Sequence, residues 1–313
     1  MKIVLAGTGS KLPSKMLTND DLAKIVDTSD EWISQRTGIR QRYIIGENEN
    51  LVSLSYEAAK GALKMSGIEG KDLGLIVVGT STQDKRFPNT ACELQHLLGA
   101  SQCACMDVSS ACSGFVYALS VAYSMMNTLD IKYALVVGGD VLSREVDWSD
   151  RTTCVLFGDG AGAVVLKKDE GDAGFLSFDI GADGSKGSAL YDNSYGEDRF
   201  IRMDGQEVFK FTIRTVPISI ENAIKNAGVS KDDIDVFILH QANLRILEAV
   251  SKKLDIPLEK LPHNLGKTGN TSAGSIPVLL DEVLREGIAK KGDLILLCGF
   301  GAGLTWGSCV LRL

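Results

Sequence analysis

One cysteine, Cys112, stands where its sulfur could act as a nucleophile. It lies in the stretch DVSSACSGFVYAL, after a predicted buried strand at 103–108 and a predicted tight turn at 109–111. From Ser113 onward the apolar residues follow helical spacing. This pattern predicts a helix whose N-terminus lies beside Cys112, where unpaired N–H groups and the helix dipole favour a thiolate. Free cysteine is also among the most buried residue types, so a core role is the alternative.

Two polar residues in the second half of the chain are candidate partners of this nucleophile. His240, one of three histidines, follows the strand-like run VFIL, and α/β proteins place their sites at the carboxyl ends of strands. Asn270 is surrounded by Gly266, Gly269 and Gly274, which allow a tight backbone close to another group. The alternatives are a packed, hydrogen-bonded histidine and an ordinary turn asparagine.

A third set of candidates lies near the N-terminus, in DTSDEWISQRTGIR. Thr28 and Glu31 have the spacing of a capping box, which predicts the start of a short helix. Trp32 and Arg36 then share one face of that helix. A tryptophan outside the core could stack on a flat base while arginine binds phosphates. The alternative is a core tryptophan beside a surface arginine.

The composition narrows the class of protein. The chain has 313 residues, of which 44% are hydrophobic and 23% charged, as expected of a soluble globular protein of about two domains. A net charge of −7 argues against nucleic acid as the main partner. No segment approaches the roughly 18 apolar residues of a membrane helix, and the N-terminal apolar run is too short for a secretory signal and predicts a strand. The seven cysteines lack metal-ligand spacing, so we expect free thiols and no metal site.

The elements that must position these residues alternate along the chain between strand-like runs and helical stripes. This alternation predicts an α/β protein with a largely parallel sheet. The clearest strand-like runs are at 75–80, 133–139, 236–240 and 294–300. The glycine-rich stretches at 157–164 and 300–304 lack the Gly-x-Gly-x-x-Gly pattern and predict tight turns beside a site. GKT at 266–268 resembles the end of a phosphate loop, but position 261 is Leu instead of the required Gly.

An internal duplication relates the two halves of the chain. Residues 58–78 align without gaps on 219–239 at an offset of 161, and two shorter matches lie at nearly the same offset. The shorter matches pair 110–114 with 271–275 and 134–139 with 295–300. Three matches in register predict two similar halves, 1–170 and 171–313, packed in a layered sandwich. We expect the functional site between the halves, where strand ends from both converge.

Several motifs together resemble β-ketoacyl-acyl-carrier-protein synthase III, the initiating condensing enzyme of bacterial type II fatty-acid synthesis. The motifs are ACSG around Cys112, HQAN at 240–243, GNTSAGSIP at 269–277 and FGAGLTWGS at 300–308, with DEWISQRTGI and FGDGAGAVVL in support. The resemblance implies the thiolase fold, an α/β fold of two duplicated halves in a five-layer αβαβα sandwich. The half at 1–170 carries the nucleophilic cysteine, and the half at 171–313 carries the histidine and asparagine. The resemblance also implies a homodimer, and the free thiols indicate a cytoplasmic protein.

The resemblance assigns roles to individual residues. It implies a catalytic triad of Cys112, His240 and Asn270, with an oxyanion hole made by the backbone N–H groups of Cys112 and Ala302. The implied CoA contacts are Thr28, Trp32, Arg36, Arg151 and Asn243, with the adenine between Trp32 and Arg151 and the pantetheine arm on Asn243. The implied acyl pocket comprises Phe87, Leu142 and Phe157, with Phe87 reaching into the partner subunit. Docking of an acidic carrier protein is expected at a positive patch of Lys210, Arg214, Arg245, Lys252 and Lys253, although a solvated helix face is the alternative.

The implied reaction is a decarboxylative condensation of a short acyl-CoA primer with malonyl-acyl carrier protein, through an acyl-cysteine, without metal or redox cofactor. Cys298 raises the alternative of a thiolase, because thiolases carry a second reactive cysteine. Against this alternative, Asn270 stands where the synthase III family has its asparagine. We therefore interpret Cys298 as a core residue at a strand end. A specialised homologue of polyketide or quinolone type stays open, as does a non-catalytic carrier-binding subunit. The sequence leaves the length and branching of the primer undetermined.

Overall fold

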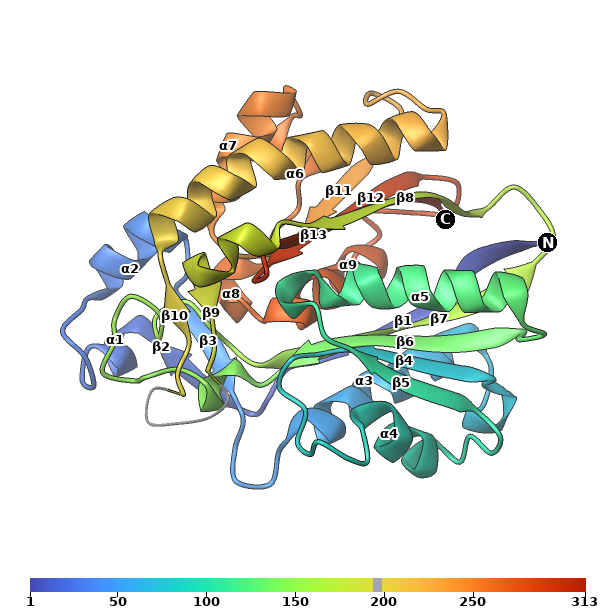
Figure 1. Cartoon of the computed structure of the whole chain (residues 1–313), viewed down its shortest axis with the longest axis horizontal. Coiled ribbons are helices and arrows are strands. Elements are labelled where there is room, and N and C mark those ends of the chain that lie inside the picture. The colour runs from blue at the N-terminus through green and yellow to red at the C-terminus, as the bar shows by residue number, and fades with distance from the viewer. Residues whose placement is uncertain (194–198) are drawn as a thin grey trace.

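The computed structural model describes residues 1–193 and 199–313 and arranges them in five layers, helix, sheet, helix, sheet, helix (Figure 1). One outer layer holds α3 (Leu51–Ser66) and α4 (Thr90–Leu98). The central layer holds α5 (Gly114–Thr128) and α9 (Ser275–Arg285), which contact both sheets. The other outer layer holds α6 (Gly205–Ala227) and α7 (Leu244–Leu254). This arrangement matches the predicted αβαβα sandwich.

The two sheets are built from different parts of the chain. The first has the strand order β1-β7-β6-β4-β5, with β1 (Lys2–Lys11), β7 (Gly160–Asp169), β6 (Tyr133–Asp140), β4 (Leu75–Gly79) and β5 (Ala104–Val108). The second has the order β11-β12-β13-β8, with β11 (Val236–Leu239), β12 (Leu294–Gly301), β13 (Thr305–Arg312) and β8 (Gly174–Ala182). The division of the chain at 170 and 171 stays a prediction about folding units.

The expectation of a largely parallel sheet is wrong for both sheets. Only the pairs β4–β5, β4–β6 and β11–β12 are parallel. The pairs β1–β7, β6–β7, β12–β13 and β8–β13 are antiparallel. The physical reason is that β13 returns from β12 through a short turn, whereas a parallel neighbour needs a long crossover.

The predicted duplication is present in the structure at the same offset of 161 residues. Both α3 and α6 end at a left-handed glycine with φ of 70°, Gly67 and Gly228. Helices α5 and α9 begin at Gly114 and Ser275, each directly after a short 3-10 turn. The halves differ at β5, whose counterpart in the second half is the short helix α8 (Leu265–Thr268).

The three largest apolar clusters of the core lie between the sheets and on the outer side of each sheet. Between the sheets, Phe115 and Val116 of α5 pack with Ile276 and Leu279 of α9. The stretch at 157–164, predicted as tight turns, is mostly strand, because β7 begins at Gly160. Its glycines have a packing role: a Cβ at Gly162 would lie 2.6 Å from the backbone of Pro277 in α9.

Short elements cover the end of the sandwich opposite the two termini (Figure 1). They are β2 (Lys15–Thr18), α1 (Asn19–Leu22), α2 (Asp30–Thr37), β3 (Gln41–Ile44), β9 (Leu190–Tyr191) and β10 (Arg202–Met203). The 3-10 turns are η1 (Gly70–Asp72), η2 (Ala111–Ser113), η3 (Leu142–Arg144), η4 (Gly184–Ala189), η5 (Leu258–Lys260) and η6 (Ser272–Gly274). Among the described helices, none combines the length and apolar character needed to cross a membrane.

Candidate active site

Cys112 lies in η2, between the end of β5 and the start of α5, as the sequence predicts. The turn is tight, since Ala111 has a positive φ of 44°, a conformation that non-glycine residues rarely adopt. The side chain is buried, with 7% of its surface exposed. Burial raises the pKa of the Cys112 thiol to about 12, and the carboxylate of Asp140 acts in the same direction, while a hydrogen bond from Ser272 opposes them. The helix N-terminus favours a thiolate here, but burial favours the thiol.

Asn270 reaches this cysteine through the equivalent turn of the second half. Its backbone pairs with Phe157 in an isolated bridge, which fixes the loop. The Asn270 Oδ1 atom accepts a hydrogen bond from the backbone N–H of Ser272 at 2.9 Å. Ser272 has a positive φ of 51° and places its Oγ 3.3 Å from the sulfur of Cys112. With Oδ1 occupied, the Asn270 amide presents its N–H₂ donors to a ligand.

His240 directly follows β11 and is 2% exposed. Its Nδ1 atom lies 2.7 Å from the hydroxyl of Ser275, the first residue of α9, and its ring packs edge-on against Phe300 at 5.0 Å. Burial lowers the pKa of His240 to about 3. The imidazole is therefore neutral near pH 7, and Nε2 is the ring nitrogen left for a ligand.

The structure brings Cys112, His240 and Asn270 together around one cavity of about 130 Å³. Cys112 comes from the first half of the chain and the other two residues from the second. Asn243 lines the same cavity and is the N-cap of α7, where its Oδ1 accepts from the backbone N–H of Arg245 at 2.9 Å. The cavity thus offers a thiol, a neutral imidazole and an amide to one reacting group.

Cys112 also lines a second cavity, of about 400 Å³. Leu142, Phe157 and Ala302 line it, as the predicted acyl pocket and oxyanion hole require. The strand end before Ala302 touches the cysteine: a Cβ at Gly301 would lie 2.7 Å from the backbone nitrogen of Cys112. Phe87 is 85% exposed and is absent from the described lining of this cavity. The catalytic, oxyanion and pocket roles of these residues stay predictions.

Apart from Asn243, the residues predicted to bind CoA gather around α2. The guanidinium carbons of Arg36 and Arg151 lie 4.5 Å and 5.1 Å from the centre of the Trp32 ring. Arg151 also donates to the backbone oxygen of Asp27 at 2.8 Å. Stacked aromatic rings are roughly 3.5 Å apart by van der Waals contact, so an adenine between Trp32 and Arg151 requires the arginine to move outward.

The predicted helix start at Thr28 is wrong by one residue. Ser29 is the N-cap of α2, and its side chain accepts from the backbone N–H of Trp32. Glu31 bonds Gln35 instead of closing a capping box. The hydroxyl of Thr28 is buried without a hydrogen-bond partner among the described residues. Its predicted contact with CoA stays a prediction and requires this buried hydroxyl to become accessible.

The basic residues predicted to dock a carrier protein lie exposed on the outer helices α6 and α7. Three of them have partners within the chain: Lys210 pairs with Glu207 at 2.9 Å, Arg245 donates to the backbone oxygen of Gln35 and Lys253 to that of Ile213. Arg214 and Lys252 complete the set. The contact from Arg245 joins this patch to α2, and docking stays a prediction.

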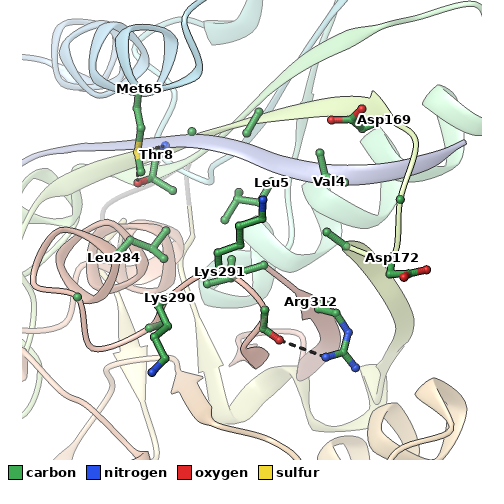
Figure 2. Close-up of a pocket in the computed structure, with 18 of the residues that line it drawn as sticks. Val4, Leu5, Thr8, Met65, Asp169, Asp172, Leu284, Lys290, Lys291 and Arg312 are labelled. Carbon is green, nitrogen blue, oxygen red and sulfur yellow. Dashed lines mark hydrogen bonds between the residues drawn. The ribbon is translucent and has the colours of Figure 1, made fainter.

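A larger cavity, of about 840 Å³, lies near the chain termini (Figure 2). It runs along β1 and past the charged side chains of Asp169, Lys290 and Arg312, which Figure 2 labels. The residues that line it, all of them described, include no Cys, His or Asn. This cavity therefore contains none of the residues of the predicted triad.

Three residues beside the predicted triad are not predicted by the sequence pattern. Ser272 bonds the sulfur of Cys112, Ser275 bonds His240, and the buried Asp140 bonds the turn that holds Ser272. The duplication offers one signal for Ser272, because this residue aligns at the offset of 161 with Ala111, which directly precedes Cys112. The other interactions join distant segments and leave no local pattern. Cys298 is fully buried in β12, as predicted for a core residue.

Comparisons with known proteins agree with the geometry. A family model described as 3-oxoacyl-[acyl-carrier-protein (ACP)] synthase III matches residues 106–184, and the model of its C-terminal region matches 224–313. The β-ketoacyl-[acyl-carrier-protein] synthase III of Xylella fastidiosa strain 9a5c is 51% identical, over 98% of this chain and 97% of that relative. The crystal structure of the synthase III from Aquifex aeolicus VF5 is similar at a TM-score of 0.96 and 46% identity, over 99% and 100% of the two chains. The crystal structure of the synthase III from Pseudomonas aeruginosa PAO1 is similar at a TM-score of 0.95 and 41% sequence identity, over 100% of this chain and 98% of that chain.

Proposed function

The chain belongs to the 3-oxoacyl-[acyl-carrier-protein] synthase III family and has its thiolase fold, and from this premise we propose the following activity. The protein transfers a short acyl group from acyl-CoA to Cys112 and condenses it with malonyl-acyl carrier protein. The products are 3-ketoacyl-acyl carrier protein, CoA and CO₂, and the reaction initiates fatty-acid synthesis. The observation that carries the proposal is the single cavity lined by Cys112, His240 and Asn270.

In the first half-reaction the Cys112 thiolate attacks the thioester carbonyl of the primer, and CoA leaves from the tetrahedral intermediate. The negative oxygen of that intermediate needs donors fixed in advance. The backbone N–H groups of Cys112 and Ala302 are the proposed donors. Their positions support this role, because Ala302 lines the cavity beside the sulfur and Gly301 packs against the Cys112 backbone.

In the second half-reaction malonyl-acyl carrier protein loses CO₂ and leaves an enolate. No base is needed, because CO₂ departs instead of a proton. His240 and Asn270 each donate a hydrogen bond to the enolate oxygen. Two observations support these roles: burial keeps His240 neutral near pH 7, and the Oδ1 atom of Asn270 is already occupied by the Ser272 N–H. The enolate carbon then attacks the acyl-Cys112 carbonyl.

Different residues are proposed to bind the nucleotide, the pantetheine arm and the acyl chain of the substrate. We propose that Trp32 and Arg151 hold the adenine of CoA, Thr28 and Arg36 contact the nucleotide part and Asn243 binds the pantetheine arm. Leu142 and Phe157 line the acyl pocket, and Phe87 completes that of a partner subunit. The CoA thioesters are substrates, and no step uses a metal or redox cofactor. Within the described residues, no group of three or more His, Cys, Asp or Glu is arranged to hold a metal.

The partners we propose are malonyl-acyl carrier protein and a second copy of the chain, in the cytoplasm. The carrier protein docks on the patch of Lys210, Arg214, Arg245, Lys252 and Lys253, whose exposure on α6 and α7 supports this. The homodimer is supported by β5, which is an edge strand with partly exposed side chains, and by the protruding Phe87. Nucleic acid and membranes have no part in the proposal.

The proposal is tested by condensation of acetyl-CoA with malonyl-acyl carrier protein, followed by mass spectrometry of the carrier. We expect acetoacetyl-carrier with the wild-type chain and none with Cys112→Ala. Formation of acetoacetyl-CoA from acetyl-CoA alone would instead indicate a thiolase. Primers of increasing length and branching, from propionyl-CoA and isovaleryl-CoA to octanoyl-CoA, define the acyl pocket. A folded chain that forms no condensation product with any of these primers would refute the proposal.

A further inference from the structure

Three hydroxyl groups beside Cys112 form a hydrogen-bonded chain that has no part in the steps above. They belong to Ser110 and Ser113, on the turn that carries Cys112, and to Thr305, the first residue of β13. Ser110 Oγ lies 2.9 Å from Ser113 Oγ, and Ser113 Oγ donates to Thr305 Oγ1 at 2.8 Å. Thr305 Oγ1 donates in turn to the carbonyl oxygen of Ala302 at 2.9 Å. The chain therefore ends on the residue whose N–H group is the second proposed oxyanion donor.

One assignment of the three hydroxyl protons uses all of these contacts. Each hydroxyl has one proton to donate and two lone pairs that can accept. Every proton is used once when Ser110 donates to Ser113, Ser113 to Thr305 and Thr305 to Ala302. The oxygens of Ser113 and Thr305 also lie 2.7 Å and 3.3 Å from the carbonyl oxygen of Ser110. The hydroxyls of Ser113 and Thr305 therefore contact both the turn before Cys112 and the turn of Ala302.

These two turns come from different halves of the chain. Ala302 lies in the short turn between β12 and β13, which closes at the paired residues Gly301 and Thr305. No backbone hydrogen bond joins this turn to residues 110–114 in the part of the chain that the structure describes. The side chains of Ser113 and Thr305 supply the connection that the backbone does not.

Packing limits how closely the two turns approach each other. A Cβ at Gly301 would lie 2.7 Å from the Cys112 nitrogen, and one at Gly299 would lie 3.0 Å from the Ser113 Cα atom. Contact of this kind resists closer approach, whereas a hydrogen bond resists separation. Ser113 is fully buried, so water does not replace a lost partner. The hydroxyl pair therefore keeps the two turns at the distance that packing allows.

We propose that Ser113 and Thr305 are positioning residues for the oxyanion hole, because their hydroxyl pair sets the distance between the N–H groups of Cys112 and Ala302. Two donors stabilise one oxygen only when both lie about 3 Å from it. The pair acts through the backbone of the two turns. This inference rests on the proposed function, in which these N–H groups bind the negative oxygen of the tetrahedral intermediate.

The test compares two reactions of the Cys112 thiol that differ in their need for an oxyanion hole. Acetyl transfer from acetyl-CoA passes through a tetrahedral oxyanion, whereas alkylation by iodoacetamide displaces iodide from a saturated carbon and forms none. In Thr305→Val and in Ser113→Ala, acetyl transfer at saturating acetyl-CoA should be slower by about ten- to 100-fold. The concentration of acetyl-CoA at half-saturation and the rate of alkylation should not change. Peptide mass measures both reactions.

A conservative variant, a double variant and a control sharpen the test. Thr305→Ser keeps the hydroxyl and should retain most of the wild-type rate. Ser113→Ala combined with Thr305→Val should lose no more than the slower single variant, because the two hydroxyls act as one unit. A matched control is Ser219→Ala, which removes one member of another buried hydroxyl pair, 2.8 Å from Ser308. This control should change neither reaction.

Three results would overturn the proposal. Equal losses of acetyl transfer and alkylation would mean that the substitutions displace the sulfur itself. Unchanged acetyl transfer in Thr305→Val would exclude a role for the pair, and additive losses in the double variant would show that the hydroxyls act separately. If Ser113→Ala does not fold, Thr305→Val decides, since it changes a partly exposed position.

Acyl transfer from p-nitrophenyl acetate separates this inference from the proposed function. This ester acylates a thiolate through the same kind of tetrahedral oxyanion and requires neither CoA nor a carrier protein. Slower acylation in Thr305→Val, in a chain that forms no condensation product, would support the positioning role and refute the condensing activity. Condensation by the wild-type chain, with unchanged acylation by this ester in Thr305→Val, would support the condensing activity and refute the positioning role.

Discussion

The hydroxyl of Ser275 should decide which nitrogen of His240 carries the proton. Neutral imidazole has one donor and one acceptor nitrogen. When the Ser275 hydroxyl donates to Nδ1 across 2.7 Å, the ring proton resides on Nε2, where it can stabilise the enolate. We therefore expect Ser275→Ala to impair decarboxylation of malonyl-acyl carrier protein and to leave acylation of Cys112 unchanged.

The magnitude follows from burial. His240 is 2% exposed, so water does not replace the lost hydroxyl, and a buried polar atom without a partner costs about 1–3 kcal/mol. If this cost falls on the tautomer that donates from Nε2, the rate of decarboxylation decreases roughly five- to 150-fold. Removing a donor to a developing negative oxygen altogether costs roughly 100- to 1,000-fold, which is the expected upper limit.

The assay measures two rates: the conversion of malonyl-carrier to acetyl-carrier without primer, and the transfer of acetyl from acetyl-CoA to Cys112. A matched control is Ser219→Ala, which removes a buried serine hydroxyl 2.8 Å from Ser308 in another part of the fold. Equal loss in both half-reactions, or no loss of decarboxylation in Ser275→Ala, would refute the assigned tautomer.

Three further predictions concern the same site. A Cβ at Gly301 would lie 2.7 Å from the Cys112 nitrogen, so Gly301→Ala should slow acetyl transfer to Cys112 by about 100-fold. The control Gly184→Ala places its Cβ in open space and should leave the rate unchanged. Equal rates for the two variants would exclude the close contact at Gly301. Leu142→Ala should enlarge the cavity of about 400 Å³ and raise the ratio of octanoyl to acetyl transfer; an unchanged ratio would place the pocket elsewhere. Burial lowers the pKa of His240 from 6.5 to about 3, so the unfolded chain binds the extra proton and stability is lost as pH falls from 6.5 toward 3. Guanidinium unfolding should show wild type losing about 2 kcal/mol more than His240→Gln between pH 7 and pH 5, and equal losses would mean that His240 titrates normally.

Hydrophobic pattern predicted much of the fold because buried strands and their flanking glycines are local signals. The strand predicted at 133–139 is β6 (Tyr133–Asp140), and the one at 294–300 is β12 (Leu294–Gly301). The direction of β7 and β13 was missed, because a strand buried on both faces has the same pattern whether its neighbour is parallel or antiparallel. The glycines of β7 predict turns when only their neighbours in sequence are considered, because the helix that packs on them comes from a distant segment.

In the candidate site, too, the sequence predicts what depends on neighbouring residues and does not predict contacts between distant segments. A cysteine at a strand-to-helix junction, a histidine at a strand end and an asparagine among glycines are readable from neighbouring residues. Asp140 and Ala273, in contrast, meet across 133 positions of the chain, and nothing near either residue indicates the contact. The protonation of Cys112 also depends on burial, which raises the pKa of the thiol to about 12. From the sequence alone, burial is only an alternative to the helix N-terminus that favours the thiolate.

The central claim is that Cys112 carries the acyl group between the two substrates. The most direct measurement is intact-protein and peptide mass after mixing the chain with acetyl-CoA, followed by addition of malonyl-acyl carrier protein. The account predicts one acetyl group on the Cys112 peptide, which disappears as an equal amount of acetoacetyl-carrier forms. An acetyl group on any other residue, or one that persists while product accumulates, would contradict it.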